Sequence, residues 1–366
     1  MIIFARCGRV ATAVRVVSNS PYSSICVAVG RGYLDDPPAS KGLAHLFEHM
    51  WFAQELDTPT VEWGETRENA VVLHHLCPSD DLPAVVDALA RRFRLYCAAR
   101  PEEIAQRAAT ELKLISLEER TAREQRGFGF PRRDIARALQ RDPEYNPIAV
   151  DTGAAYLDDL SSFPAGCRLA VCVAGPRPQL SPEDIAAAFA VESDFERVWP
   201  VPALTGSWAT DVEGCAAAAW ILPSNADAVA AVWLVAELID QSVPPPSLRW
   251  VSGRVVSPYG ATPVRGGHLF AIAAGIGSGH PPDLLNDYLL RLLDEPIRLG
   301  GIRRSIAATR IEAADQAAID AVDLIGRATD HDAVRLAASR ASNETIGALA
   351  DLLSRCPHAR FGANRA

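Results

Sequence analysis

Apolar residues recur along the chain in two patterns, one typical of buried strands and one typical of amphipathic helices. Continuous apolar runs predict strands at 24–29, 168–174, 215–222 and 267–275. Spacing close to the helical period predicts helices over 84–97, 101–125, 225–241, 282–295, 301–326 and 331–355. Strands and helices are mixed in two similar halves, which indicates an α+β fold made from a duplicated unit.

A further predicted helix begins near residue 43, with Ser40 placed to cap its N-terminus. Its apolar stripe consists of Leu43, Leu46, Phe47, Met50 and Trp51. Beside the stripe lies an HxxEH sequence that contains His45, Glu48 and His49. Residues four apart on a helix are separated by only about 40° around its axis, so the two imidazoles point the same way and can bind one Zn²⁺. A solvated polar helix face is the alternative explanation.

Two glutamates on the helix predicted for 101–125 can supply the third ligand that a catalytic zinc site requires. Glu111 and Glu118 are seven residues apart and therefore share one helix face, together with Ile104, Ala108 and Ile115. Carboxylates on an apolar stripe are costly to bury unless they are paired or bind a metal. Glu118 as a ligand, with Glu111 behind it as a supporting acceptor, resolves this conflict.

The helical and strand periodicity breaks between Val191 and Ser207, where Pro200 and Pro202 lie. We therefore expect a first domain over 1–195, a linker over 196–206 and a second domain over 207–366.

Composition and charge narrow the class of protein. Of the 366 residues, 49% are hydrophobic and 22% charged, which excludes disorder for most of the chain. The net charge of −9 disfavours nucleic acid and anionic membranes as partners. No apolar run approaches the roughly 18 residues of a membrane span, and the N-terminus lacks a signal-peptide pattern. The eight cysteines form no CxxC pair, so we expect reduced thiols and a cytoplasmic location.

The sequence resembles the M16 metallopeptidases, the insulinase, pitrilysin and mitochondrial-processing-peptidase group, as a short M16B-like member. The resemblance rests on GRGYLDDPPASKGLAHLFEHMWF at 30–52 and on the later pair Glu111-x6-Glu118. It implies two tandem related α/β-sandwich domains, each a mostly antiparallel sheet packed with helices. It also implies His45, His49 and Glu118 as ligands of one Zn²⁺ per chain, Glu48 as general base and Glu111 as supporting carboxylate.

The sequence departs from the family pattern in two places. The family's Asn-Ala-x-Thr strand aligns either through Thr66 or through Asn69, so no substrate role is assigned to Asn69. An Arg and a Tyr, seven residues apart, reach the substrate from the second domain in active members of the family. They align here with Arg249, a candidate substrate-binding residue, and with Val256, while Tyr259 is out of register.

The resemblance implies a zinc endopeptidase that cleaves peptides or unfolded segments, and leader- or signal-peptide processing is one role that it allows. Because only half of the Arg/Tyr pair is present, we expect a heterodimer with a related subunit that carries the pair. A homodimer is the alternative. The competing class is a non-catalytic peptide-binding scaffold, although such members of the family have usually lost the zinc motif.

Three other candidate sites carry less weight. A strand would send His74 and His75 to opposite faces, which favours core or edge histidines. The acidic and histidine cluster at 330–332 lies between helical patterns and suits a solvated loop or a helix cap. The glycine-rich stretch at 274–280 lacks the lysine and the following helix of a phosphate-binding loop.

Overall fold

The computed structural model describes residues 2–17, 20–37, 40–124, 132–142, 144–146, 149–150, 156–164, 167–176, 179–190, 204–210, 214–244, 246–252, 261–264, 267–276, 283–294, 302, 313–326, 331–356 and 358–362. Their contacts divide the chain into two compact units. The first comprises Met1–Thr121, Pro147–Trp199 and Ile311–Arg327. The second comprises Ala122–Asn146, Pro200–Arg310 and Ala328–Ala366.

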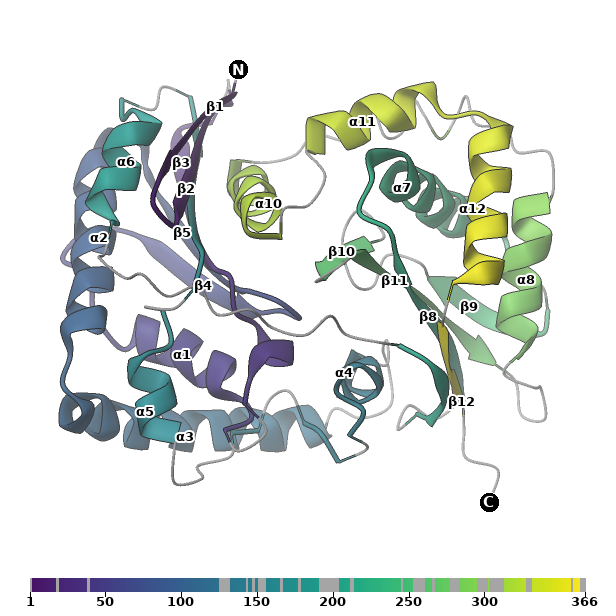
Figure 1. Ribbon diagram of the computed structural model, residues 1–366, viewed down its shortest axis with the longest axis horizontal. Helices are drawn as coiled ribbons and strands as arrows, with labels where there is room; N and C mark the ends of the chain where they lie inside the picture. Colours follow the sequence, from purple (N-terminus) through teal and green to yellow (C-terminus); the bar gives the residue numbers. More distant parts are fainter. Residues whose placement is uncertain are drawn as a thin grey trace. The chain divides into compact units, whose positions relative to one another are not determined.

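A six-stranded sheet forms the centre of the first unit, with the strand order β1-β2-β6-β3-β5-β4 (Figure 1). Its strands are β1 (Ile2–Cys7), β2 (Val10–Val16), β3 (Tyr22–Val29), β4 (Val61–Thr66), β5 (Val71–Pro78) and β6 (Leu169–Gly175). Neighbouring strands run antiparallel, except that β2 and β6 are parallel. β4 is the last strand in this order and is therefore an edge strand.

Helices cover both faces of this sheet, with α2 and α6 on one side and α10 on the other (Figure 1). The helices of the unit are α1 (Leu43–Phe52), α2 (Leu82–Ala98), α3 (Pro101–Glu124), α5 (Tyr156–Ser161), α6 (Pro182–Ala188) and α10 (Ala313–Gly326), with the short 3₁₀ turns η1 (Tyr33–Asp35) and η2 (Ser79–Asp81). Because both faces are covered, β3 and β6 read as continuous apolar runs rather than as alternating ones.

The two faces of the sheet differ in side-chain size. On β6, Val171 and Val173 point to the α2 face, whereas Ala170 and Cys172 point to α10. Small residues on the strands and on the helix let α10 approach the sheet closely. Asp320 of α10 then accepts two hydrogen bonds of 2.8 Å each from the guanidinium of Arg15 on β2.

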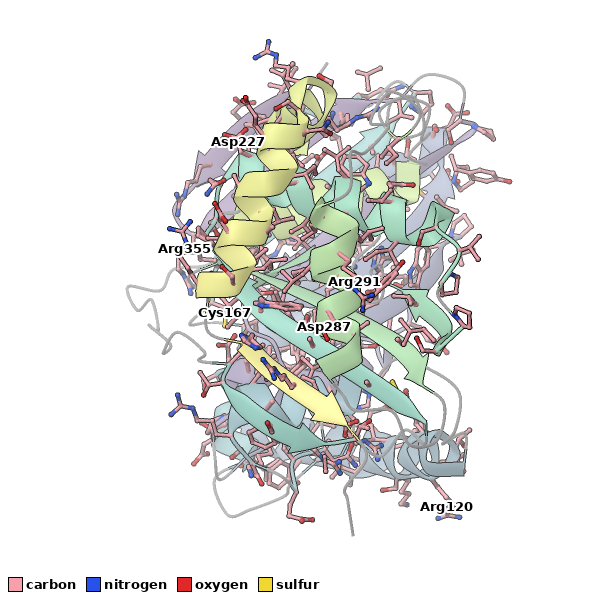
Figure 2. All side chains as sticks on the ribbon, turned by 90° about the vertical axis from the view of Figure 1, so that its right-hand side faces the viewer. Arg120, Cys167, Asp227, Asp287, Arg291 and Arg355 are labelled. Atoms are coloured by element: carbon pink, nitrogen blue, oxygen red, sulfur yellow. The ribbon has the colours of Figure 1, made fainter. Side chains whose placement is uncertain are left out.

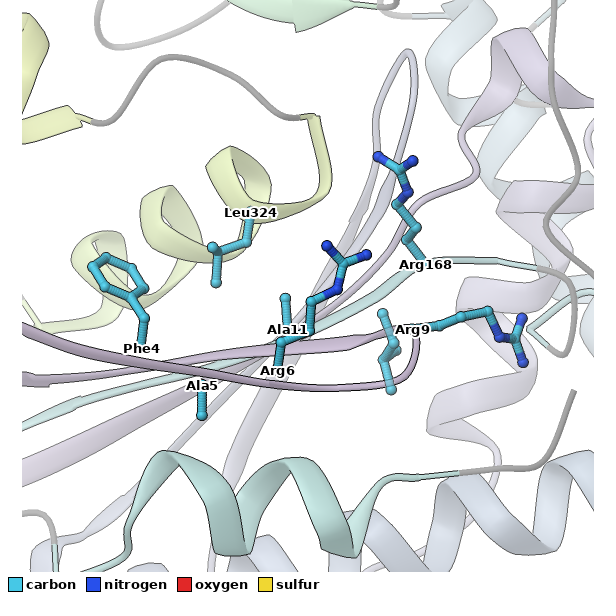
Figure 3. A pocket seen from close by; sticks show the side chains of 8 residues that line it. Phe4, Ala5, Arg6, Arg9, Ala11, Arg168 and Leu324 are labelled. Carbon is cyan, nitrogen blue, oxygen red and sulfur yellow. The ribbon is translucent and has the colours of Figure 1, made fainter. Parts of the chain in front are cut away.

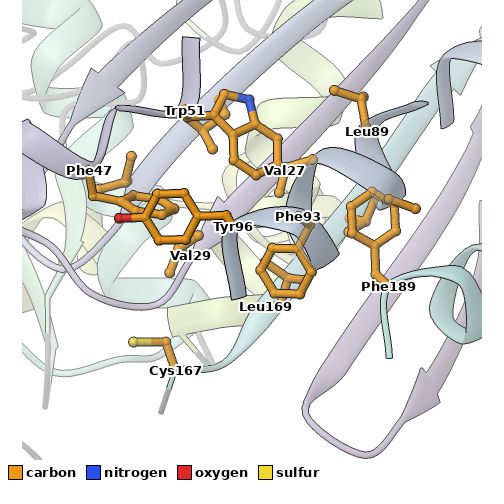
Figure 4. Close-up of a cluster of buried hydrophobic side chains, with 14 of the residues drawn as sticks. Val27, Val29, Phe47, Trp51, Leu89, Phe93, Tyr96, Cys167, Leu169 and Phe189 are labelled. Atoms are coloured by element: carbon orange, nitrogen blue, oxygen red, sulfur yellow. The ribbon is translucent and has the colours of Figure 1, made fainter. Parts of the chain in front are cut away.

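An aromatic cluster beneath α1 fixes that helix against the rest of the first unit (Figure 4). The ring of Phe47 stacks on Phe163 at 4.6 Å and meets the edge of Tyr96 at 5.0 Å. The hydroxyl of Tyr96 donates to the carbonyl of Leu160, so its polar atom is satisfied inside the core. The apolar stripe predicted for this helix is therefore the face that packs.

The second unit has its own six-stranded sheet, ordered β10-β11-β8-β12-β7, with β9 also pairing with β11. Its strands are β7 (Gly206–Ala209), β8 (Cys215–Leu222), β9 (Leu248–Ser252), β10 (Ala261–Val264), β11 (Gly267–Ile276) and β12 (His358–Gly362). Its helices are α4 (Arg132–Gln140), α7 (Ala226–Gln241), α8 (Asp283–Asp294), α11 (His331–Arg340) and α12 (Asn343–Arg355). Charged side chains such as Asp227, Asp287 and Arg355 lie on the exposed sides of α7, α8 and α12 (Figure 2).

The predicted fold class is confirmed, because each unit is a mostly antiparallel sheet packed with helices. The division of the chain is more interleaved than predicted. Helix α10, assigned by sequence to the second domain, packs on the first sheet, and α4 belongs to the second unit. Most of the predicted linker, 196–206, lies outside the described residues, so the linker remains a prediction.

Two local expectations are corrected. Ser40 does not cap α1: its hydroxyl donates to Asp159, and Gly42 is the N-cap residue. The helix predicted over 331–355 is two helices, because Ser342 caps a new one through the backbone N–H of Thr345. Among the described helices, none combines the length and the apolar character that crossing a membrane requires.

Candidate metal centre

Helix α1 begins at a point that the preceding acidic loop determines. Gly42 adopts the left-handed conformation with φ of 79°, and the backbone N–H of Ala44 donates to Oδ1 of Asp36 at 3.0 Å. Asp36 thus replaces the capping side chain that the helix start itself lacks. Burial raises the pKa of this carboxyl to about 8, although the charge of Arg31 and the helix N–H groups act to lower it.

The two histidines of HxxEH lie one turn apart on α1 and face Glu118 of α3. Their ring centroids are 4.8 Å apart. Oε2 of Glu118 lies 3.5 Å from Nε2 of His45 and 3.3 Å from Nε2 of His49. One ligand atom from each of the three residues falls within 4.8 Å of the others. The pKa of Glu118 is lowered, chiefly by its hydrogen bond with His45.

This spacing suits a zinc ion. Tetrahedral ligands at 2.0–2.1 Å from the metal are about 3.3–3.4 Å apart, which is close to the two nitrogen–oxygen distances found here. Two imidazoles and one carboxylate form a donor set found in catalytic zinc sites, which keep a fourth position open. The residues present therefore fit the metal that the sequence predicts.

Glu111 lies behind this group, as the sequence predicts. Its Oε2 is 3.4 Å from Nδ1 of His49, the ring nitrogen that does not face Glu118. The side chain of Glu111 is only 11% exposed, against 52% for Glu118. Glu118, the more exposed of the two, faces the Nε2 atoms of both histidines. Glu111, the more buried, faces the opposite edge of the His49 ring.

Glu48 flanks the histidines and points to the edge strand β4. The hydroxyl of Thr66 donates to its Oε2 at 2.6 Å. Burial raises the pKa of Glu48, and the Thr66 hydrogen bond and the two histidines oppose that shift. The sequence leaves open whether Thr66 or Asn69 matches the family's Asn-Ala-x-Thr strand. In the structure Thr66 is the last residue of β4, and Asn69 lies between β4 and β5.

The predicted substrate-binding residues belong to the second unit. Arg249 lies on β9, and its side chain is outside the described residues. Val256 and Tyr259 are also outside them. The role of Arg249 in binding substrate therefore stays a prediction.

The weaker candidate sites remain separate from this centre. His74 and His75 are buried on opposite faces of the first sheet, as predicted. Nδ1 of His75 lies 2.8 Å from Glu62, and Nε2 of His74 lies 3.3 Å from Glu65. All eight cysteines are free thiols. Parts of the stretches at 330–332 and 274–280 lie outside the described residues.

A cavity of about 400 Å³ lies elsewhere in the first unit, over β1, the start of β6 and the end of α10 (Figure 3). Three arginines line it, together with Phe4 and Leu324: Arg6, Arg9 and Arg168. None of the residues around the histidine pair contributes to its wall. This cavity is therefore not part of the candidate metal centre.

Comparisons with known proteins bear on the family and on the fold of the chain. The family model described as insulinase (peptidase family M16) matches residues 12–125. A search of curated proteins finds no match. A protease from Helicobacter pylori has a similar structure, with a TM-score of 0.69, 13% identity and 99% of each chain covered.

Two further solved structures are similar. A peptidase M16 inactive domain from Pseudomonas fluorescens gives a TM-score of 0.66 and 13% identity, with 100% of this chain and 98% of that one covered. Pitrilysin gives a TM-score of 0.62 and 15% identity, with 99% of this chain and 45% of the pitrilysin chain covered. Residues 12–125 therefore match the model of peptidase family M16, and the chain as a whole shares the fold of these solved peptidase structures.

Proposed function

We propose that this chain is a zinc-dependent endopeptidase that cleaves peptides or unfolded segments. One observation carries the proposal: His45, His49 and Glu118 bring three ligand atoms within 4.8 Å, and the carboxylate of Glu48 lies beside them. Family membership supports a peptidase scaffold, but one similar structure is described as an inactive domain. The complete donor set is what favours activity here.

The side chains divide the chemistry among them. His45, His49 and Glu118 would hold the ion, and zinc, when bound, supplies a Lewis acid that polarises the scissile carbonyl and makes a water more acidic. Glu48 takes the proton of the attacking water and later delivers it to the leaving amine. Burial raises the pKa of Glu48, which suits a group that must both accept and release a proton.

The first test combines metal analysis with digestion of a peptide library. Purified protein should contain about one zinc per chain, and Glu48→Gln should keep the zinc yet lose nearly all hydrolysis, because an amide does not accept the proton. His49→Ala should lose both. Glu103→Gln, on the exposed first turn of α3, is the control. Absence of zinc after dialysis against the metal would contradict the proposal, as would full activity of Glu48→Gln.

We also propose that the active form is a heterodimer with a related subunit that supplies the Arg/Tyr pair, with leader- or signal-peptide processing as a role. Arg249 aligns with the family arginine, but valine stands at the tyrosine position, 256. Preorganised donors for the developing oxyanion are worth about 10²–10³ in rate. The chain alone should therefore bind zinc and cleave slowly, and a related chain without HxxEH should form a 1:1 complex of higher activity. Full turnover by a homodimer would contradict this.

A further inference from the structure

The general-base candidate is held by a single short hydrogen bond from the neighbouring strand. Oγ1 of Thr66 lies 2.6 Å from Oε2 of Glu48, a length typical of a hydroxyl that donates to a charged carboxylate. Because Oε2 accepts this bond, the carboxylate cannot rotate freely about its last torsion. The two oxygens of Glu48 are therefore not equivalent.

The same strand also leaves space for the Glu48 side chain. A Cβ atom on Gly64 would lie 2.7 Å from both Cγ and Oε1 of Glu48, and 2.7 Å from Cε2 of Phe52. Carbon atoms do not approach so closely, so any side chain at position 64 would displace Glu48 or Phe52. Gly64 and Thr66 are two residues apart on β4 and therefore face α1 together.

A third residue of this strand face fixes β4 relative to α1. Glu62 lies 2.7 Å from the guanidinium of Arg92 on α2 and 2.8 Å from Nδ1 of His75. Arg92 also donates to the carbonyl of Gln54, two residues beyond the end of α1. One buried cation thus bridges the strand that carries Thr66 and the helix that carries Glu48.

We propose that Thr66 and Gly64 are positioning residues for Glu48: Thr66 holds Oε2 through its hydroxyl, and Gly64 leaves the space that the carboxylate occupies. This inference rests on the proposed function, since it assumes that Glu48 is the base. Thr66 touches neither the ligand group nor, in this scheme, the substrate. Its removal should therefore change the rate of the chemical step without changing the affinity for zinc or substrate.

The test compares Thr66→Val, Thr66→Ser and Gly64→Ala on the best-cleaved peptide of a quenched-fluorescence library. Thr66→Val should lower kcat about 10- to 100-fold, because it removes one charge-assisted hydrogen bond, with KM and zinc affinity unchanged. Thr66→Ser keeps the hydroxyl and should restore most of kcat. Gly64→Ala displaces Glu48 and should lower kcat about 100-fold.

Two matched controls separate positioning from loss of structure. Thr12→Val removes another buried hydroxyl of the same sheet, which donates to the carbonyl of Pro182 at 2.9 Å, and it should reduce stability without changing kcat. Gly347→Ala adds a methyl group in open space on α12 and should leave kcat unchanged, although alanine's higher helix propensity should raise stability slightly. A wild-type kcat for Thr66→Val, or a fall that Thr66→Ser does not restore, would overturn the inference while leaving the zinc endopeptidase proposal intact.

Crystal structures of the zinc-loaded wild type and Thr66→Val test the same point without any activity. If the wild type cleaves no peptide, the proposed function fails, but the geometry can still be judged. The carboxylate of Glu48 should lie over Gly64 in the wild type and rotate away in Thr66→Val. An unchanged Glu48 position in the variant would overturn the inference.

Discussion

Oε2 of Glu111 lies 3.4 Å from Nδ1 of His49, on the opposite edge of the imidazole from Glu118. One ring thus lies between two carboxylates of the same helix, two turns apart. A carboxylate at Nδ1 fixes the tautomer that leaves Nε2 free to bind a metal, and it makes that nitrogen a better ligand. This contact lets Glu111 orient and polarise His49 without being a metal ligand itself in the proposed site.

Removing Glu111 should weaken zinc binding without abolishing it. Glu111→Ala should raise the dissociation constant for zinc about 10- to 100-fold, as is typical for the supporting partner of a metal-bound histidine. Glu111→Gln keeps an acceptor oxygen and should have a smaller effect. Competition against a chromogenic zinc chelator measures both variants, with the exposed Glu102→Ala as the control. Wild-type affinity in Glu111→Ala would show that His49 needs no such partner.

Gly42 should prove essential for the start of α1. Besides its left-handed φ, a Cβ at this position would lie 2.0 Å from the carbonyl oxygen of Ala149. Gly42→Ala should therefore lower the free energy of unfolding by about 3 kcal/mol or more, which combines the conformational cost and the clash. Gly8→Ala is the matched control, because Gly8 also has positive φ (57°) but open space around it. Gly8→Ala should lower the free energy of unfolding by only about 1–2 kcal/mol. Equal losses in urea unfolding would show that the contact with Ala149 is not tight.

The helical period explains how much of the centre could be predicted from sequence. His45 and His49 are four residues apart, and Glu111 and Glu118 are seven apart, so helix geometry alone places each pair on one face. The need for a third ligand and the cost of burying carboxylates on an apolar stripe connect the two helices, and the resemblance to M16 supports that connection. The structure brings these four side chains together with Glu48 beside them.

Features that depend on distant parts of the chain could not be predicted in the same way. Thr66 contacts Glu48 only because β4 packs beside α1, and two alignments of that strand were equally good from sequence. Residue type alone predicts Ser40 as the cap, yet the loop turns so that the carboxylate of Asp36 accepts the hydrogen bond from the backbone N–H of Ala44. The assignment of α10 to the first unit depends on contacts such as Arg15 with Asp320, 305 residues apart. No local pattern encodes such a pairing.

Arg92 should be the residue on α2 whose loss most disturbs the region behind α1. Its buried guanidinium lies 2.7 Å from Glu62, donates to the Gln54 carbonyl and stacks over Trp51 with its centre 5.5 Å from the ring. Arg92→Met would leave the Glu62 carboxylate without its cation. We expect a loss of about 3 kcal/mol in the free energy of unfolding, in the range found when one partner of a buried ion pair is removed.

The surface pair Arg100–Glu103 provides the comparison for Arg92. Its nitrogen–oxygen distance is 2.6 Å, similar to that in the buried pair, but the Arg100 side chain is 74% exposed. Arg100→Met should therefore change stability very little, because solvent screens exposed ion pairs. Urea unfolding of both variants gives the two losses directly. A similar loss of unfolding free energy in both variants would show that burial does not strengthen the ion pair between Arg92 and Glu62.

His268 should make the second unit sensitive to mild acid. It lies on β11 and is 2% exposed, and burial lowers its pKa to about 4. In the unfolded chain the pKa of this histidine is about 6.5. Between about pH 6.5 and pH 4, the unfolded state therefore binds a proton at His268 that the folded state does not bind. The free energy of unfolding should therefore fall as the pH drops through this window, by about 2 kcal/mol between pH 7 and pH 5 from this group alone. His268→Gln cannot titrate and should remove that part of the pH dependence. The measurement is urea unfolding of wild type and variant at both pH values, and identical pH dependence would show that His268 is protonated as readily in the folded state as in the unfolded one.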